Sequence, residues 1–215
     1  MCISATKTII MKKSVPILLF LFSANILLSQ SRSGGFRGGI NLAQWKLTVT
    51  YQGASASQTS DTKTGFLIGL FQTYMFNKNV GIQPEIFYNS NGSILNGATF
   101  TTNYVSVPVF FRYNMSDQFH LLGGPQLSIL ASADCSVPGA GSGSIKEYVN
   151  STDFGLVFGL GGDFGRFNLG VRYNLGLTGV FNSSFNNLAF GNSGIDAKFT
   201  NVGWQIVCGA KAFGN

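Results

Sequence analysis

The side chains that could carry out chemistry are sparse in this sequence. Its single histidine, His120, closely follows Ser116 and Asp117, so a serine, a histidine and an acid occur together. A hydrolase built on them would need the three groups within hydrogen-bond reach of one another. Ser116 and Asp117 fall in the stretch "MSDQ", where serine and aspartate commonly bond to the backbone of a tight turn. We therefore expect no enzymatic activity and assign no catalytic residue, with a lipid-modifying enzyme that depends on His120 as the alternative.

A glycine-rich stretch at residues 154–177, "FGLVFGLGGDFGRFNLGVRYNLGL", is the second candidate for chemistry. Gly159, Gly161 and Gly165 approach a dinucleotide-binding fingerprint, but the third glycine of that motif would have to stand at Phe164. The fingerprint also requires a helix that begins at the glycines. Apolar and polar residues alternate on both sides of "GR" instead, and a period of two is typical of β-strands. We expect no bound cofactor, and no metal because the cysteines lack Cys-x-x-Cys spacing.

The same alternation recurs along the chain and predicts eight strands, at roughly 34–42, 65–76, 80–90, 103–114, 119–131, 152–164, 167–180 and 202–213. Each is about as long as a tilted strand must be to cross a bilayer. Tight connections alternate with long polar ones, the tight ones at 77–79, 115–118 and 165–166 and the long ones at 43–64, 91–102, 132–151 and 181–201. We therefore predict an all-β fold, an eight-stranded antiparallel up-and-down transmembrane β-barrel. An even number of strands puts both mature ends on the side of the tight turns.

Along each predicted strand one face is apolar and the other is polar and rich in glycine. In such a barrel the apolar face meets lipid and the polar face lines the interior. By this parity the inward ionisable side chains are Arg37, Glu85, Arg112, His120, Asp153, Asp163, Arg172 and Lys211. We expect a structural network that fills the lumen, with Glu85 beside Arg112 and Arg172 beside Asp153 or Asp163 on neighbouring strands. A proton- or ion-conducting role is the alternative.

The N-terminus has the features of an export signal. The stretch "MKKSVPILLFLFSANILLSQ" begins with Lys12 and Lys13 and continues with an apolar run too short to span a bilayer comfortably. We predict a signal peptide over residues 1–29, with residues 1–10 upstream of the true start at Met11, and a barrel domain over residues 30–215. An anchoring helix is the alternative. Removal of the signal leaves 11 of the 14 basic residues against 8 acids, so the formal charge falls from +6 to +3. No basic face remains that would favour nucleic acid as a partner.

Aromatic side chains stand among polar residues in two of the long connections. Trp45 and Tyr51 lie within 43–64, and Phe185 and Phe190 lie within 181–201. Exposed aromatics in polar loops can contact glycans or partner proteins. These four residues are therefore the predicted loop contacts. The alternative is that the loops fold back on their own aromatic rings.

Several runs, in order along the chain, resemble the PorT-like outer-membrane β-barrel family of Bacteroidetes, among them "GFLIGLFQTYMF" at 65–76, "IQPEIFYNSNG" at 82–92, "YVSVPVFFRYN" at 104–114 and "LLGGPQLSIL" at 121–130. The resemblance implies an eight-stranded barrel in the Gram-negative outer membrane, in contact with its lipid and inserted by the barrel-assembly machinery. Both mature termini would then be periplasmic. It implies little about activity. We expect a structural or interaction role through the extracellular loops, with an accessory role in type IX protein secretion and a soluble lipocalin-like binder as alternatives.

The last predicted strand departs from the family pattern at its end. Trp204, Ile206 and Cys208 share the apolar parity, whereas Phe213 falls on the other one. Barrels that resemble this one usually end on a lipid-facing aromatic. Either a bulge near Gly209 shifts the register, or Phe213 lies just beyond the lipid band.

Overall fold

The structure, a computed structural model, describes residues 31–51, 53–185 and 196–214. The predicted signal peptide at 1–29 and the predicted loop contact Phe190 lie outside these residues. Within the described part of the chain, no helix is both long and apolar enough to cross a membrane.

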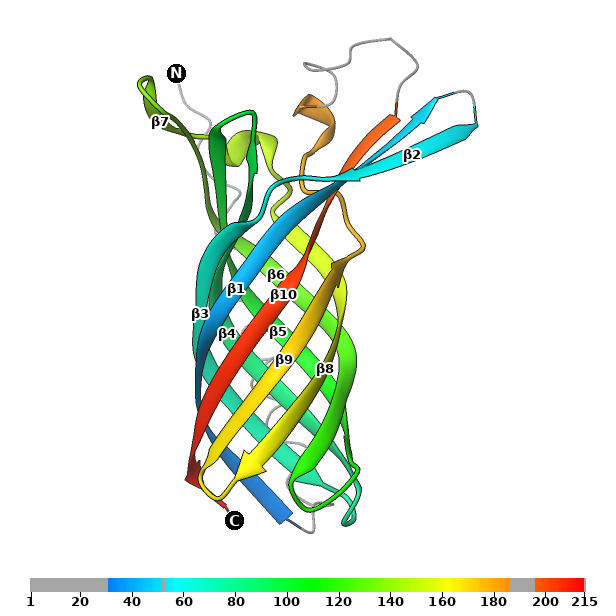
Figure 1. Ribbon diagram of the computed structural model, residues 1–215, viewed down its shortest axis with the longest axis vertical. Coiled ribbons are helices and arrows are strands. Elements are labelled where there is room, and N and C mark those ends of the chain that lie inside the picture. The colour runs from blue at the N-terminus through cyan, green and yellow to red at the C-terminus, as the bar shows by residue number, and fades with distance from the viewer. Residues whose placement is uncertain (1–30, 52, 186–195, 215) are drawn as a thin grey trace, which may run out of the picture.

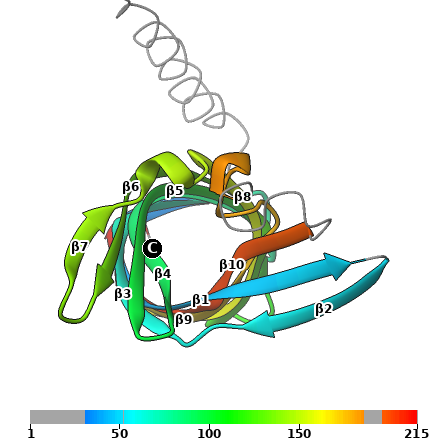
Figure 2. The same cartoon turned by 90° about the horizontal axis from the view of Figure 1, so that it is seen from above.

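The described chain is almost entirely β-structure. Its long strands are β1 (Ser31–Tyr51), β3 (Lys63–Met75), β4 (Val80–Leu95), β5 (Ala98–Asn114), β6 (Phe119–Val137), β8 (Thr152–Phe164), β9 (Phe167–Gly176) and β10 (Asp196–Phe213). Between them lie the short strands β2 (Ala54–Thr59) and β7 (Gly141–Ser144) and the 3-10 helix η2 (Lys146–Tyr148). Successive long strands pair antiparallel, and β10 also pairs with β1. The result is an antiparallel, up-and-down, barrel-like sheet (Figure 1; Figure 2).

The three tight connections lie where the alternation predicted them, at one end of the sheet (Figure 1). In the first, the Asn77 side-chain oxygen accepts hydrogen bonds from two backbone N–H groups of its own turn, at 2.9 and 2.8 Å. In the second, the Ser116 hydroxyl accepts two such bonds at 3.3 and 3.0 Å. In the third, Gly165 has a φ of 62°, a backbone conformation that glycine adopts without steric cost. Local side-chain and backbone chemistry therefore fixes this end of the sheet.

The connections predicted as long loops are in large part strands, so that part of the sequence prediction was wrong. β1 and β2 form one extended hairpin, in which the hydroxyls of Thr48 and Ser57 lie 3.1 Å apart. β4 and β5 continue to a tight turn at Asn96–Gly97, and β6 continues far enough to pair with β7. Serine, threonine and asparagine indicated loops because they favour turns, but here they also pair across extended ladders. The predicted strand at 167–180, in contrast, ends at Gly176.

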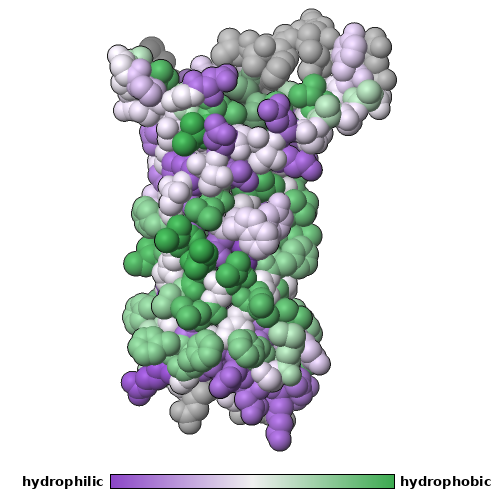
Figure 3. All heavy atoms as spheres, viewed as in Figure 1, coloured by the Kyte–Doolittle hydropathy of each residue, from purple (hydrophilic) through white to green (hydrophobic). Residues whose placement is uncertain are grey.

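The outer surface carries the apolar side chains that the alternation assigned to lipid. Exposed apolar residues of this surface are Phe36, Ile40, Phe66, Ile68, Leu70, Val105, Val109, Phe111, Phe154, Phe158, Leu160, Leu169, Val171, Trp204 and Ile206. On the face shown in Figure 3, apolar side chains gather along the middle of the barrel, between more polar ends. A large contiguous apolar surface on a folded chain indicates contact with lipid rather than with water.

A β-bulge at Ala212 sets the register of the last strand. Gly34 of β1 pairs with Phe213, whereas the next residue of β1 pairs with Lys211, so Ala212 has no partner of its own. The extra residue turns Phe213 toward the apolar outer face, where its side chain is exposed. Of the two alternatives for this strand, the bulge is the one found, slightly beyond Gly209.

Candidate functional site

One carboxylate between two guanidinium groups occupies the centre of the barrel interior. Glu85 of β4 is completely buried. Arg172 of β9 donates two hydrogen bonds to it, at 2.7 and 2.8 Å, and Arg37 of β1 donates another. The side-chain amide of Gln83 adds a fourth bond at 2.7 Å. Bidentate, charge-assisted bonds are strong and fix geometry. This central cluster therefore ties β4 to β1 and β9 across the lumen.

Aromatic rings and a buried amide complete the surroundings of the two arginines. The Arg37 guanidinium lies 4.4 Å from the centre of the Phe71 ring, and that of Arg172 lies 4.7 Å from the centre of the Phe110 ring. Arg37 also donates a hydrogen bond of 2.9 Å to the side-chain oxygen of Asn168. The face of an aromatic ring attracts a cation electrostatically, and the Asn168 side-chain amide takes the place of a water molecule that the buried Arg37 guanidinium has lost. The lumen is therefore filled by packed side chains rather than left open.

A second ionic cluster lies nearer the tight turns. The Asp163 carboxylate accepts a hydrogen bond of 2.5 Å from Arg112, and the His120 Nδ1 lies 3.7 Å from the same carboxylate. The Nζ of Lys211 lies 4.0 Å away on the other side. Arg112 also donates to Gln83 at 3.1 Å, which connects this cluster to the central one. The charged groups form one continuous network along this half of the lumen.

The charges that meet are not the ones predicted to meet. The expected pair of Glu85 and Arg112 does not form, because Glu85 binds Arg37 and Arg172 while Arg112 binds Asp163. The prediction considered only neighbouring strands. In a narrow barrel, long arginine side chains also reach carboxylates on strands that are not neighbours.

Asp153 lies at the other end of the lumen, also without its predicted arginine. It accepts hydrogen bonds of 2.8 Å from both the Thr178 hydroxyl and the Asn201 amide. The predicted pairing of Arg172 with Asp153 or Asp163 was wrong because that guanidinium is directed at Glu85, the central carboxylate. Asn201 also accepts a bond of 3.0 Å from the indole N–H of Trp45, so the polar lumen continues into an aromatic cluster.

This aromatic cluster closes the interior on the side of the long hairpins. Trp45 is buried there, with its ring centre 5.2 Å from that of Phe100 and 5.1 Å from that of Phe181. Phe185 stacks on Phe181 with a centroid separation of 4.0 Å. Other buried members are Tyr104, Leu130, Ala133, Val149 and Val180. Trp45 is therefore not the exposed loop contact that we predicted, because burial against other rings removes it from water. Phe185 is half-buried against the cluster, and Tyr51 is exposed.

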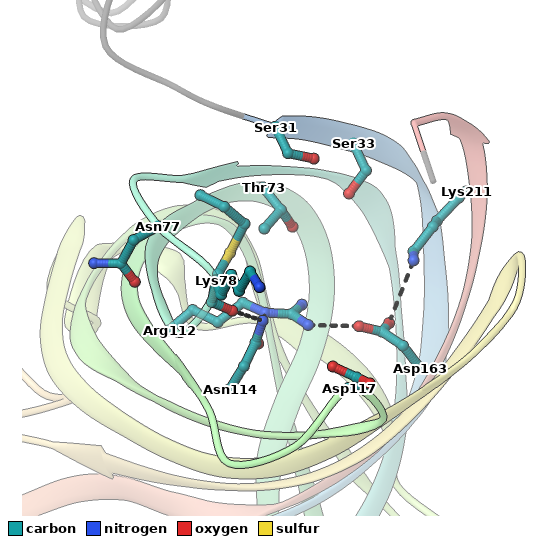
Figure 4. Close-up of a pocket in the computed structure, with 11 residues that line it drawn as sticks. Ser31, Ser33, Thr73, Asn77, Lys78, Arg112, Asn114, Asp117, Asp163 and Lys211 are labelled. Carbon is teal, nitrogen blue, oxygen red and sulfur yellow. Dashed lines mark hydrogen bonds and ion pairs between the residues drawn. The ribbon is translucent and has the colours of Figure 1, made fainter.

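At the opposite end the lumen opens into a cavity of about 420 Å³ between the tight turns (Figure 4). Arg112 and Lys211 approach Asp163 from two sides of this cavity (Figure 4). Other lining residues are Ser31, Ser33, Thr73, Met75, Asn77, Lys78, Asn114 and Asp117. Because two of its cations share one carboxylate, the charges of the cavity largely compensate one another. Arg112 and Asp163 of the ionic network therefore form part of the wall of this cavity.

Ser116 and His120, which were considered as parts of a hydrolytic site, make different contacts in the structure. The Ser116 hydroxyl accepts hydrogen bonds from its own turn. His120 is buried in the lumen, beside Asp163. Among the described residues, no group of three histidine, cysteine, aspartate or glutamate side chains could hold a metal ion. Cys135 and Cys208 are free thiols.

Comparison with known protein families identifies the family to which this barrel belongs. Residues 28–182 match the family described as outer membrane protein beta-barrel domain. The chain belongs to this family. Membership of the outer membrane beta-barrel family, together with the apolar outer surface, places the protein in the Gram-negative outer membrane in contact with its lipid. A comparison with curated proteins finds no match.

Three solved structures are similar to this family member. Ail, the attachment invasion locus protein of Yersinia pestis, is 16% identical, with 82% of this chain and 98% of that chain covered and a TM-score of 0.41. Neisserial surface protein A is 15% identical over 84% of this chain and 99% of that one, with a TM-score of 0.46. OprG of Pseudomonas aeruginosa is 16% identical over 85% and 96%, with a TM-score of 0.38. Ail has also been solved with the heparin analogue sucrose octasulfate. At these identities the neighbours transfer no ligand or role to this barrel.

Sequence reasoning missed the amides that connect the network. Asn168 accepts a hydrogen bond from Arg37 of the central cluster, and Gln83 joins Glu85 of that cluster to Arg112 of the second one. Their inward parity was a usable signal, since a buried polar side chain in a barrel must find a partner. The identity of that partner had no signal in the sequence.

Proposed function

We propose that this protein is an eight-stranded outer-membrane barrel, closed by the pairing of β10 with β1, that neither conducts solutes nor catalyses a reaction. Its role is to hold structured hairpins outside the cell, where they contact partners. The observation that carries the proposal is the filled interior. Glu85 and its two arginines occupy the centre of the lumen, and the Trp45 cluster covers one end.

The β1–β2 hairpin is the best candidate for such a contact. It extends sideways beyond the rim of the barrel (Figure 2), and every residue of β2 is exposed. The strand consists of alanine, serine, glutamine and threonine, without charge, and Tyr51 is exposed at the end of β1. Hydroxyl and amide groups beside an aromatic ring suit hydrogen bonding and stacking with a glycan or with a protein surface.

We also propose that both mature termini are periplasmic. The start of β1 and the end of β10 lie at the same end of the barrel as the three tight turns (Figure 1). Bacterial outer-membrane barrels have short periplasmic turns and longer extracellular loops. The hairpins would then face the outside of the cell.

The narrower placement with PorT-like barrels is part of the proposal as well. It is supported by the runs "IQPEIFYNSNG" and "LLGGPQLSIL" at 82–92 and 121–130, which lie in β4 and β6. A role in secretion does not follow from these runs. It would be favoured instead if a deletion strain retained exported cargo in its periplasm.

Two measurements test the proposed function. In planar lipid bilayers we expect no stable stepwise conductance from the purified barrel, and a defined channel would contradict the filled lumen.

The second measurement tests the β1–β2 hairpin. Residues 48–57 are replaced by a short Gly-Ser turn, and residues 138–143 at the tip of the β6–β7 hairpin are replaced in a matched control. Cells that display each protein are applied to arrays of glycans and extracellular proteins. We expect only the replacement of residues 48–57 to abolish binding. The gel mobility of both variants should still shift on boiling, which shows that the barrel is folded. An unchanged binding profile would remove the β1–β2 hairpin from the proposal.

A further inference from the structure

Two hollows meet on the outside of the barrel at the end of β10. The first is an apolar groove of about 230 Å³, whose lining includes Phe36, Leu70 and Phe213. The second is a pocket of about 350 Å³ at the tip of the β8–β9 turn, whose lining includes Arg166 and Lys211. Phe213 lines both hollows. The apolar groove and the basic pocket therefore lie next to each other, on either side of Phe213.

The bulge in β10 and a glycine of β1 create this arrangement. The bulge at Ala212 places the Phe213 ring against β1, at a point where Gly34 has no side chain. A Cβ added at Gly34 would lie only 2.7 Å from the ring. Gly35 and Ala212, which line the groove, are small, so backbone forms part of its floor. The walls are exposed side chains from neighbouring strands, including Phe36 and Leu70.

The basic pocket lies where the apolar surface ends. Arg166 is exposed in the β8–β9 turn, and Arg32 is exposed near the start of β1. A side chain added at Gly214, which lines the pocket, would meet the Arg32 carbonyl oxygen, so β1 approaches the pocket from its other side. Among the described residues that line the two hollows there is no carboxylate. Lys211 has Asp163 as a neighbour at 4.0 Å, at the lumen side.

We propose that these two hollows form a binding site for one anionic phospholipid. The lipid belongs to the membrane leaflet on the same side as the tight turns. One acyl chain occupies the apolar groove along Phe36 and Leu70. The phosphate lies at the pocket beside the exposed Arg166, and the exposed Arg32 of the adjoining β1 adds positive charge nearby. Basic side chains at a membrane surface attract anionic lipid, and guanidinium groups bind phosphate through paired hydrogen bonds. With the termini placed as in the proposed function, this leaflet is the periplasmic one. The site itself does not depend on the proposed role of the hairpins.

The test uses the purified full-length barrel in mild detergent and three probes: phosphatidylglycerol, phosphatidylcholine with the same acyl chains, and inorganic phosphate alone. Native mass spectrometry counts retained lipid, and the temperature at which the folded gel band disappears reports stabilisation. We expect phosphatidylglycerol to be retained and to raise that temperature, and phosphatidylcholine and phosphate to have little effect. Arg166→Gln should weaken phosphatidylglycerol binding about fivefold, and Arg32→Gln with Arg166→Gln about 25-fold. Leu70→Trp, which fills the groove, should reduce retention without changing the charge.

Lys78→Gln is the matched control, because this exposed lysine lines the cavity between the turns and neither of the two hollows. Equal retention of both lipids by the wild type would overturn the proposal. An effect of Lys78→Gln as large as that of the Arg32 and Arg166 double variant would also overturn it. Stabilisation by inorganic phosphate equal to that by phosphatidylglycerol would reduce the site to a phosphate site and refute the lipid. Failure of the proposed function shows separately, as channel conductance or as binding that ignores the hairpin.

Discussion

Substitution of Glu85 by glutamine tests whether the central cluster stabilises the barrel. Glu85 is completely buried and accepts bonds from Arg37, from both terminal nitrogens of Arg172 and from Gln83. The glutamine side chain has the same shape but no charge, and its NH₂ group would face guanidinium donors. Two buried cations would then lack their counter-charge. Loss of one partner of a buried ion pair costs about 3–5 kcal/mol. We expect the free energy of unfolding to fall by about that amount.

The measurement is a guanidinium titration of the barrel folded into phosphatidylcholine vesicles, with tryptophan fluorescence and the boiling-dependent gel shift as two readouts. Glu147→Gln is the control, since Glu147 is exposed on η2, and its effect should stay within about 0.5 kcal/mol. Adding Arg172→Gln to Glu85→Gln should recover part of the loss, because one unpaired cation is removed. If Glu85→Gln lowers the free energy of unfolding by less than about 1 kcal/mol, the reasoning is refuted. The lumen must then be wet enough to solvate its charges.

Three further substitutions test other parts of the structure. Trp45→Ala should cost about 3–5 kcal/mol of local stability and speed proteolysis of the hairpin side while the gel shift on boiling persists, and an unchanged cleavage rate would contradict the buried cluster. Gly34→Ala should slow membrane insertion of the refolding barrel because the added Cβ would lie 2.7 Å from the Phe213 ring. Gly38→Ala is the control and should leave the insertion rate unchanged, since its Cβ would have its nearest contact at 3.7 Å. Equal insertion rates for the two variants would argue against the outward position of the ring. His120→Ala should leave the acyl-chain composition of outer-membrane lipids unchanged, and a change in that composition would favour the lipid-modifying enzyme.

The local features of this barrel could be predicted from its sequence. Alternation along 152–164 and 167–180 predicted both strands, the second of which ends at Gly176, and the inward positions of Asp163 and Arg172. The "MSDQ" stretch gave a tight turn, and Ser116 has the predicted backbone role. These properties depend on a period of two and on bonds within a few residues, so a single strand or turn encodes them.

Only the tertiary structure decided which side chains meet. Glu85 and Arg172 lie on β4 and β9, which do not pair, and they meet because the sheet curves around a narrow interior. Trp45 is buried because separate connections converge above the lumen, although its polar sequence neighbours indicated an exposed loop. The bulge that turns Phe213 outward depends on the register between the first and last strands. Curvature, convergence and register arise from contacts between segments far apart in the chain, and no local pattern specifies them.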